Sequence, residues 1–428
     1  MTKQLINATI IACVGLIYLL GCSGEEDVLH EDELLEMSLE EGAPTAPDGC
    51  AILAKPAGFT DNALSEANAK FGFKLLAELY NQKPNKNVFI SPLSISIALT
   101  MTYNGARGAT KQAMAKTLEI EGMDLGAVNQ ANAELREILK SADPQIELAI
   151  ANSIWLRNTF DEVNPDFLDR NDRFFGAEIA SLDFDDPQTV ETINQWVNTN
   201  TQGKIKEILG EIEEHEVMFL INAIYFKGGW KGKFDASKTQ DGVFHLLDGG
   251  EKQVPMMSHT CNYSYLESGD FRAVGLPYGE GRVSMYIFLP EHSSNLDEFL
   301  ADLNAENWEN WLSRFWNERD LRFIMPRFRL EYGMLLNDAL KALGMEIAFI
   351  PYVANLEGIA PLLFIEKVIH KTFLEVNEEG TEAAAVTLVS PPPASTPGPF
   401  VVNRPFFFAI HDNWTNTILF MGIVVEPM

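Results

Sequence analysis

The sequence predicts an α+β fold, because segments with helical periodicity and short apolar runs typical of strands follow one another without regular strand-helix alternation. The chain has 428 residues, of which 46% are hydrophobic and 22% are charged, so it can bury a large core. Its composition changes sharply only near the amino terminus. One large domain over residues 61–428, preceded by an export signal and a tether, is therefore expected.

Helices are expected where apolar residues recur at helical spacing, and strands where apolar runs are short. The expected helices span residues 61–80, 92–103, 128–140, 189–199, 296–300 and 332–343. The expected strands span residues 147–155, 217–226, 273–276, 283–289, 321–328, 368–376, 406–411 and 418–425, and a further short strand begins at Asn87.

The start of the chain has the features of a signal peptide. Lys3 precedes an apolar run over residues 10–20, which is too short for a stable membrane span and indicates a signal at residues 1–21. Leu19-Leu20-Gly21-Cys22 resembles a bacterial lipoprotein box, so Cys22 is the expected lipidated first residue of the mature protein. An unmodified cysteine behind an ordinary secretory signal is the alternative.

Residues 22–60 are expected to form an acidic, flexible tether. Ser23 to Thr60 holds ten Asp or Glu residues against a single Lys55. Ser23 and the acidic residues after it resemble the start of lipoproteins that are sent to an outer membrane or to its outer face. We therefore expect an exported protein, lipid-anchored to the bacterial cell envelope at the outer membrane or cell surface, facing the extracellular space; which membrane face it occupies stays open.

The formal net charge of -29 disfavours nucleic acid and heparin-like polyanions as ligands, because these require clustered Lys or Arg. Solubility is the simpler explanation of the acidity. Of the four cysteines, Cys13 leaves with the signal and Cys22 takes lipid, so Cys50 and Cys261 remain. We expect both to be inert free thiols, since neither a disulfide framework nor zinc-site spacing is apparent, and we predict no metal.

Residues 378–403 fit neither a helix nor a core strand, and a loop of this length is usually functional or disordered. Small or uncharged side chains alternate over residues 381–390, so one strand face can be buried without desolvating a long charged side chain, which would cost roughly several kcal/mol. That face consists of Thr381, Ala383, Ala385, Thr387 and Val389. The segment can therefore enter a sheet, although an ordinary edge strand or a linker would have the same composition.

The following stretch, residues 391–399, contains Pro391, Pro392, Pro393, Pro397 and Pro399. Proline has no N–H and a fixed φ, so this stretch cannot readily become a central strand. We expect an extended, exposed tip that is accessible to proteases.

Ten short segments together resemble the serpin family, in the family's order, from residue 61 to residue 427. They are residues 87–94, 105–110, 222–230, 254–257, 276–278, 326–328, 343–345, 370–371, 375–387 and 403–406. One of the ten reads Asn222-Ala223-Ile224-Tyr225-Phe226-Lys227-Gly228-Gly229-Trp230. Each is weak alone, but the ordered set is specific.

The resemblance implies a large central, mostly antiparallel sheet with further β-sheets, surrounding helices and an exposed reactive-centre loop. It also implies a protease inhibitor rather than an enzyme, acting as a suicide substrate without a cofactor. A serine protease attacks a bait bond in the loop and becomes an acyl-enzyme. The cut loop then inserts as a central strand and deforms the protease, whose deacylation slows, since one lost oxyanion-hole donor costs roughly 3 to 4 kcal/mol.

By this resemblance the hinge comprises Glu378, Glu379, Gly380, Thr381, Glu382, Ala383, Ala384 and Ala385. Counting forward from Gly380 and backward from residues 403–406 places the bait bond between Ala394 and Ser395. Ala394 suits the shallow pocket of an elastase-like or subtilisin-like protease. A bond one or two residues away is the alternative. Pro391 or Pro392 is expected to weaken only the last ladder contacts of the inserted strand.

The family's shutter and breach residues match Ser91, Ser94, Asn222, His370 and Trp230. The shutter is where the sheet must part, and the breach lies under the top of the opening sheet. A satisfied buried histidine without a special role is the alternative for His370, and a buried tryptophan needs no function. Ser395 and the seven histidines lack the sequence context of a nucleophile or its base, so we predict no catalytic residue.

The expected partner is a target serine protease bound covalently by a monomer, with membrane contact through the lipid only. Residues 128–140 lack the basic cluster with which some serpins bind heparin, so no heparin cofactor is expected. A non-inhibitory serpin serving as a binding or chaperone protein is the competing interpretation. Such proteins often have bulky or charged hinges, unlike residues 381–387. The physiological protease, and whether cysteine proteases are also trapped, stay open.

Overall fold

The computed structural model describes residues 50–59, 62–140, 142–159, 163–291, 296–381 and 398–427. The predicted signal peptide, Cys22, hinge residues Glu382 to Ala385, and the predicted bait residues Ala394 and Ser395 lie outside these ranges.

The helices are α2 (Ser65–Gln82), α3 (Pro92–Tyr103), α4 (Gly108–Thr117), α5 (Leu125–Lys140), α6 (Pro165–Phe175), α7 (Gln188–Asn200), α8 (Leu296–Asp302), α9 (Ala305–Leu312) and α10 (Asn337–Leu340), with short helical turns at Ala236–Lys238, Lys341–Met345 and Glu346–Phe349. The strands are β1 (Val88–Ile90), β2 (Ile146–Arg157), β3 (Glu178–Leu182), β4 (Met218–Gly229), β5 (Gln240–His245), β6 (Glu251–Glu267), β7 (Phe271–Pro277), β8 (Val283–Pro290), β9 (Trp316–Pro326), β10 (Phe328–Leu335), β11 (Lys367–Val376), β12 (Gly380–Thr381), β13 (Phe400–Val401), β14 (Phe406–Asp412) and β15 (Thr417–Val424).

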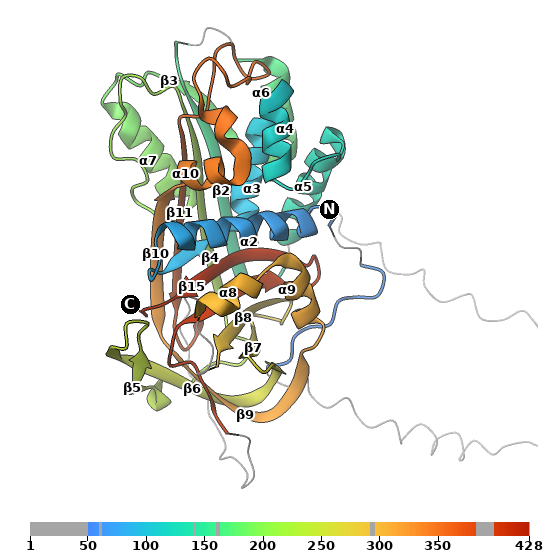
Figure 1. The fold of residues 1–428 in the computed structure, drawn as a ribbon, viewed down its shortest axis with the longest axis vertical. Coiled ribbons are helices and arrows are strands. Elements are labelled where there is room, and N and C mark those ends of the chain that lie inside the picture. The colour runs from blue at the N-terminus through green and yellow to red at the C-terminus, as the bar shows by residue number, and fades with distance from the viewer. Residues whose placement is uncertain are drawn as a thin grey trace, which may run out of the picture. The chain divides into compact units, whose positions relative to one another are not determined.

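The strands form two sheets, which confirms the predicted α+β class (Figure 1). The six-stranded sheet has the order β10-β11-β4-β2-β3, and β12 pairs with β4. Within it, β11–β4 and β2–β3 are parallel while the other pairs are antiparallel. The nine-stranded sheet has the order β1-β15-β14-β8-β7-β6-β9-β13, and β5 pairs with β6.

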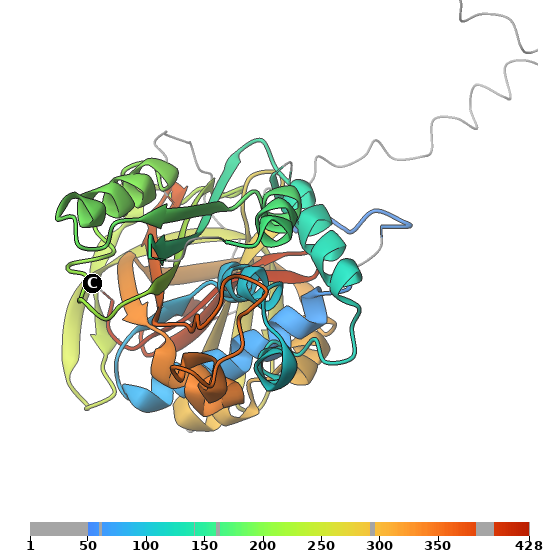
Figure 2. The ribbon, with the colours of Figure 1, turned by 90° about the horizontal axis from the view of Figure 1, so that it is seen from above.

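The six-stranded sheet is covered on both faces, which explains why β4 is apolar almost throughout. One face packs against α7 through Ile193 and Val197, which belong to the same buried cluster as Phe219 and Ile221 of β4. Helix α3 packs on β4 and β2 from the other face. Figure 2 shows α7 outside the sheet, on the side away from α2.

Local sequence signals explain how α3 begins. The hydroxyl of Ser91 accepts a hydrogen bond from the backbone N–H of Ser94, and Pro92 occupies the first turn, where its missing N–H costs nothing. The capping residue Ser91 is also one of the predicted shutter residues. The start of α3 therefore positions part of the candidate site.

The predicted helix at residues 332–343 is wrong in its first part. Tyr332 to Leu335 belong to β10, which pairs antiparallel with β11, and the α-helix is limited to Asn337–Leu340. Alternate residues of β10 are buried, so its apolar positions also fit a strand of period two. Pairing with β11, which is distant in sequence, decided between the two patterns.

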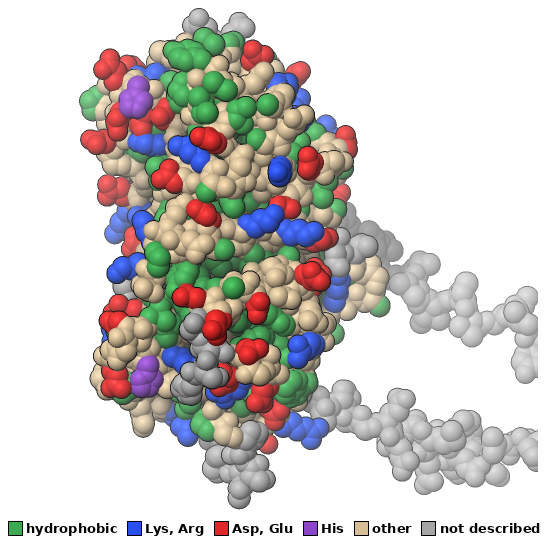
Figure 3. All heavy atoms as spheres, viewed as in Figure 1, with side chains coloured by type: hydrophobic (Ala, Val, Ile, Leu, Met, Phe, Trp, Pro, Cys, Tyr) green, Lys and Arg blue, Asp and Glu red, His purple; other side chains and the backbone are tan. Residues whose placement is uncertain are grey.

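Charged side chains of both signs are interspersed over the face shown in Figure 3. Among the described residues, none of the helices combines the length and the apolar character that crossing a bilayer requires.

A buried ion pair links the start of β8 to the end of β14. The Arg282 Nη2 atom lies 2.7 Å from Asp412 Oδ2, and both side chains are buried. The guanidinium also stacks over the Trp414 ring at 4.7 Å. The carboxylate accepts the backbone N–H groups of Trp414 and Thr415 as well, so its hydrogen-bonding capacity is well used.

Replacing Arg282→Met should lower the free energy of unfolding by about 3–5 kcal/mol, because Asp412 would remain buried without its counter-charge. Urea unfolding of the purified variant and wild type measures the difference. Lys70→Met is the control, since Lys70 and Glu66 are 45% and 66% exposed and their pair should contribute at most about 1 kcal/mol. Equal losses in the two variants would contradict the prediction.

Candidate functional site

The site lies where β4 and β11 separate. The two strands run parallel and pair directly over residues 219–225 of β4 and 367–373 of β11. Beyond these pairs β12 begins, with Gly380 antiparallel and opposite Gly229 of β4. A bridge between Asn377 and Gly380 turns the chain back from β11. A strand continued from Gly380 would thus run antiparallel to both neighbours.

Gly380 and Thr381 of the predicted hinge already occupy this open end. Gly380 has a φ of 138°, and a Cβ atom there would collide with the carbonyl oxygen of Gly228, so glycine is required. Thr381 is 1% exposed, and its hydroxyl lies 3.1 Å from the hydroxyl of Tyr278. The small Thr381 side chain therefore points into the protein, as the alternation of the sequence predicted for this face.

Trp230 holds the turn that leads into the hinge. Its indole N–H donates to the carbonyl of Asn377 at 2.8 Å, and its backbone N–H donates to the carbonyl of Glu379 at 2.8 Å. Its ring stacks on Tyr278 with 4.3 Å between centroids. From the sequence we assigned Trp230 to the breach. We gave Tyr278 no role, although Tyr278 lies within the family-like segment 276–278.

Glu378 is 4% exposed and is held by two partners. The guanidinium of Arg327 pairs with its carboxylate, and the hydroxyl of Thr239 donates to it. Burial alone would raise the pKa of Glu378, but the hydrogen bonds from Arg327 and Thr239 outweigh it and lower that pKa. Arg327 lies in a family-like segment, whereas no sequence signal pointed to Thr239.

The predicted shutter residues meet in one buried network. His370 of β11 lies opposite Asn222 of β4, and their side chains are hydrogen-bonded across the strand pair. The backbone N–H of Ser91 donates to Nε2 of His370, so the proton sits on Nδ1 and is donated to Asn222. The Asn222 amide in turn donates to Ser94 and to Asn152.

This network joins the two strands that the predicted insertion must separate. His370 is fully buried, and burial lowers its pKa to about 3, so the ring is neutral near neutral pH. Asn152 of β2 was not predicted, because a lone asparagine in a strand carries no distinguishing signal. Separation of β4 from β11 would break the His370–Asn222 bond and leave two buried polar groups without their partner.

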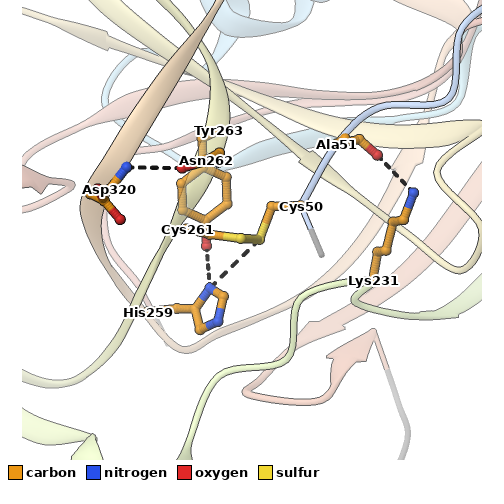
Figure 4. The surroundings of a disulfide bond; sticks show 8 residues. All are labelled: Cys50, Ala51, Lys231, His259, Cys261, Asn262, Tyr263 and Asp320. Carbon is orange, nitrogen blue, oxygen red and sulfur yellow. Dashed lines mark hydrogen bonds between the residues drawn. A yellow bond between two sulfur atoms is a disulfide. The ribbon is translucent and has the colours of Figure 1, made fainter. Parts of the chain in front are cut away.

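The prediction of free thiols at Cys50 and Cys261 is wrong. The two residues form a disulfide, with their Cα atoms 6.1 Å apart and 211 positions apart in sequence (Figure 4). Sequence spacing offered no sign of it, because folding alone brings the segment before α2 against β6. Residues 50–59, which we assigned to the tether, contain this bond and further contacts with the domain.

Comparison with known proteins identifies the fold and the family. Residues 66–427 match the model of the family described as serpin (serine protease inhibitor). The human leukocyte elastase inhibitor is 35% identical over 388 residues, which cover 85% of this chain and 99% of that protein. A serpin-like protein of Thermococcus kodakarensis is 34% identical over 366 residues, covering 83% of this chain and 84% of its own length.

Solved structures agree with this assignment. The thermophilic serpin tengpin in its native state has a TM-score of 0.78 and 31% identity, and the match covers 88% of this chain and 97% of tengpin. Thyroxine-binding globulin in complex with thyroxine also has a TM-score of 0.78, at 26% identity, covering 85% of this chain and 99% of the globulin. The protein therefore has the serpin fold and belongs to the serpin family, a family described as serine protease inhibitors and not as enzymes.

Proposed function

We propose that this serpin traps an elastase-like or subtilisin-like serine protease as a covalent acyl-enzyme. The protease cleaves between Ala394 and Ser395, and the loop after Gly380 then inserts between β4 and β11. The observation that carries the proposal is the register of Gly380 and Thr381, which are already paired at the open end of the sheet.

Extending this register gives an inserted strand of matching length. Gly380 lies opposite Gly229 on one side and bridges to Asn377 on the other. The same alignment brings Ser390 opposite Phe219 and Lys367, which form the first pair of the β4–β11 ladder. Residues 381–390 would therefore replace the direct pairing over its full length.

The side chains also fit this register. Ala383, Ala385 and Val389 would face the buried apolar residues Phe226, Ile224 and Leu220 of β4. Thr387, the polar member of the same face, would come between Asn222 and His370. Its hydroxyl can accept and donate, so it can replace the hydrogen bond that these two residues lose when the strands part. Polar and apolar positions thus match along the whole strand.

Insertion is favoured energetically because one parallel ladder is replaced by two antiparallel ones. Each additional backbone hydrogen bond contributes about 0.5–1.5 kcal/mol net, and antiparallel pairing is slightly more stable per residue. The intact loop is held at both of its ends, so its insertion beyond the hinge is slow. Cleavage releases the downstream end, so that the acyl-enzyme at Ala394 is drawn along the sheet.

The choice of protease rests on Ala394 and on the named relatives. A small side chain fits a shallow specificity pocket, and relatives at 34–36% identity are named leukocyte elastase inhibitors. In this proposal the protein acts as a monomer, without heparin. It is exported and lipid-anchored through Cys22 to a bacterial cell envelope, and residues 23–49 keep the inhibitor away from the membrane.

Incubation with an elastase should produce a complex that survives denaturing electrophoresis, because the acyl bond persists after insertion. The released carboxyl-terminal fragment should begin at Ser395 when its mass is measured. The protein cut in its loop should also unfold at a higher temperature than the intact protein. Cleavage without a stable complex and without added heat resistance would reject inhibition and support a non-inhibitory binding or chaperone role.

Thr381→Arg should convert the inhibitor into a substrate, since the guanidinium would have to be buried beside Tyr278 at a cost of roughly several kcal/mol. The number of inhibitor molecules consumed per protease inactivated, obtained by titration, should rise severalfold. Thr381→Val is the matched control, because it keeps the shape without a charge. If Thr381→Arg titrates like wild type, the hinge assignment fails.

Acidification should weaken the intact protein over the window from about pH 6.5 to about pH 3. Unfolded His370 takes up a proton near its ordinary pKa of 6.5, whereas the buried residue does so only at about 3, so the unfolded state binds more protons between these values. Thermal unfolding measured at pH 7 and pH 4.5 tests this.

His259, with a pKa lowered to about 4, and His411, whose pKa is also lowered, contribute to the same trend in the wild-type protein. The difference between wild type and His370→Gln therefore isolates the shutter. The variant should lose less stability on acidification, and an identical pH profile would exclude His370 as a contributor.

A further inference from the structure

The disulfide fastens the segment before α2 to the nine-stranded sheet. Cys50 is 0% exposed and is bonded to Cys261 of β6. The Nδ1 atom of His259 lies 3.8 Å from the sulfur of Cys50 and 2.7 Å from the hydroxyl of Tyr263 (Figure 4). The bond therefore sits in a packed environment and fixes where residues 51–53 can lie.

Residues 51–53 lie along the outside of the turn between β7 and β8. The backbone N–H of Leu53 donates to the carbonyl of Gly281 at 2.8 Å. The ammonium group of Lys231 donates to the carbonyls of Ala51 at 2.9 Å and Glu280 at 3.1 Å. Gly281 has a φ of 100°, and a Cβ atom there would lie 2.9 Å from the carbonyl oxygen of Ala51, so the two segments are in close contact.

The same turn carries the hinge on its inner side. Tyr278 stacks on Trp230 and contacts the hydroxyl of Thr381. Lys231 follows Trp230 directly, and its backbone N–H donates to the carbonyl of Pro277 at 2.9 Å. One short turn thus connects the disulfide-held segment, through Lys231, with the residues that hold the hinge.

We propose that the Cys50–Cys261 disulfide and Lys231 are positioning elements of the trapping reaction, which act as a brace that delays loop insertion until a protease cuts the loop. This inference rests on the proposed inhibitory function. Insertion requires the end of β4 to move relative to β11, and that end is linked through the turn at 278–281 to residues 51–53. The disulfide ties these residues to β6, in the nine-stranded sheet that also contains the turn. Through its hydrogen bond to Ala51, Lys231 holds the end of β4 to that sheet, so the end of β4 resists displacement.

Without the bond, residues 50–59 would be held by the chain leading to α2, by a few hydrogen bonds and by the packing of Ile52 and Phe59, and a segment with few contacts opens more readily. Lys231 would then lose an acceptor whenever the segment left. We expect the brace to affect the rate of spontaneous insertion more than the encounter with the protease, because its residues lie away from Ala394 in sequence and contact the hinge only through the turn.

Cys50→Ser tests the brace. Wild type and variant are held below their unfolding temperatures, and the elastase-inhibiting titre is followed over time. The variant should lose titre faster, by on the order of fivefold or more, the effect of about 1 kcal/mol on a barrier. The inactive product should be soluble, uncleaved, monomeric and more heat-resistant than the starting protein, as an inserted form must be.

Lys231→Met removes the hydrogen bonds from the ammonium group to Ala51 and Glu280 while leaving the disulfide in place. It should reproduce part of the faster loss of titre expected for Cys50→Ser. Lys74→Met is its matched control, since Lys74 of α2 pairs with Glu119 at a distance from the brace and its loss should leave the rate unchanged. Treating folded wild type with a phosphine should give the rate of Cys50→Ser. The phosphine donates two electrons to the disulfide and takes its oxide oxygen from water, whose two protons complete the two thiols. Lys231→Met and the reduced protein carry the test if Cys50→Ser does not fold.

The outcomes separate the two levels of the argument. Unchanged rates in Cys50→Ser, Lys231→Met and the reduced protein would overturn the brace while leaving inhibition intact. Loss of titre through aggregation or unfolding alone would reduce the disulfide to a general stabiliser and would also overturn it. If wild type cut in its loop gains no heat resistance, the proposed function fails first and the brace fails with it.

Discussion

The direct parallel pairing of β4 with β11 is the constraint on which the rest of the site depends. Both strands are covered by packed side chains, and both continue past their last shared pair to an end where Gly380 and Thr381 enter. Parallel neighbours of this kind can accept an antiparallel strand between them, since each has hydrogen-bonding groups facing the other. The candidate residues in the described part of the chain lie along this pairing, at its open end, or, like Ser91 and Ser94 at the start of α3, in contact with it.

In the proposed mechanism, the buried His370–Asn222 bond resists the separation of β4 from β11. A buried polar pair contributes little net stability when it is satisfied, but separating it exposes the full desolvation penalty of both groups. In the proposed mechanism this penalty arises in the middle of the sheet and adds to any restraint at its open end. Apolar residues in place of His370 and Asn222 would remove both the desolvation penalty and the resistance to opening. A polar residue inserted between them, such as Thr387 in the proposed register, would satisfy both groups. The network of Ser91, Ser94 and Asn152 keeps both side chains oriented for that exchange.

The sequence was informative where function depends on local pattern. The apolar runs predicted six strands of the nine-stranded sheet and three of the six-stranded sheet. The small alternating residues after Gly380 predict a segment able to enter a sheet, and Thr381, the part of it that the structure describes, is buried. The sequence was uninformative where contacts join distant segments. The Cys50–Cys261 bond, the Arg327–Glu378 pair and the contribution of Asn152 depend on which strands become neighbours, and a single sequence does not contain that information. The helix predicted over residues 332–335 was wrong for the same reason, since their apolar positions fit both a helical period and a strand period of two.

The register of Gly380 on β4 also indicates where the prolines at residues 391–393 would lie after insertion. Ser390 would be the last residue opposite both β4 and β11, so Pro391 falls opposite Met218, at the first residue of β4 and beyond the last pair with β11. Proline at a strand end loses no central ladder bond, because the missing N–H faces outward or has no partner. Residues 391–393 would then leave the sheet as a stiff, extended spacer of about 3.1 Å per residue. A stiff spacer transmits the pull of the inserted strand to the acyl bond with little slack, whereas a flexible one would absorb it. The proline run is therefore compatible with trapping, and its position directly after the ladder accounts for why it need not obstruct insertion.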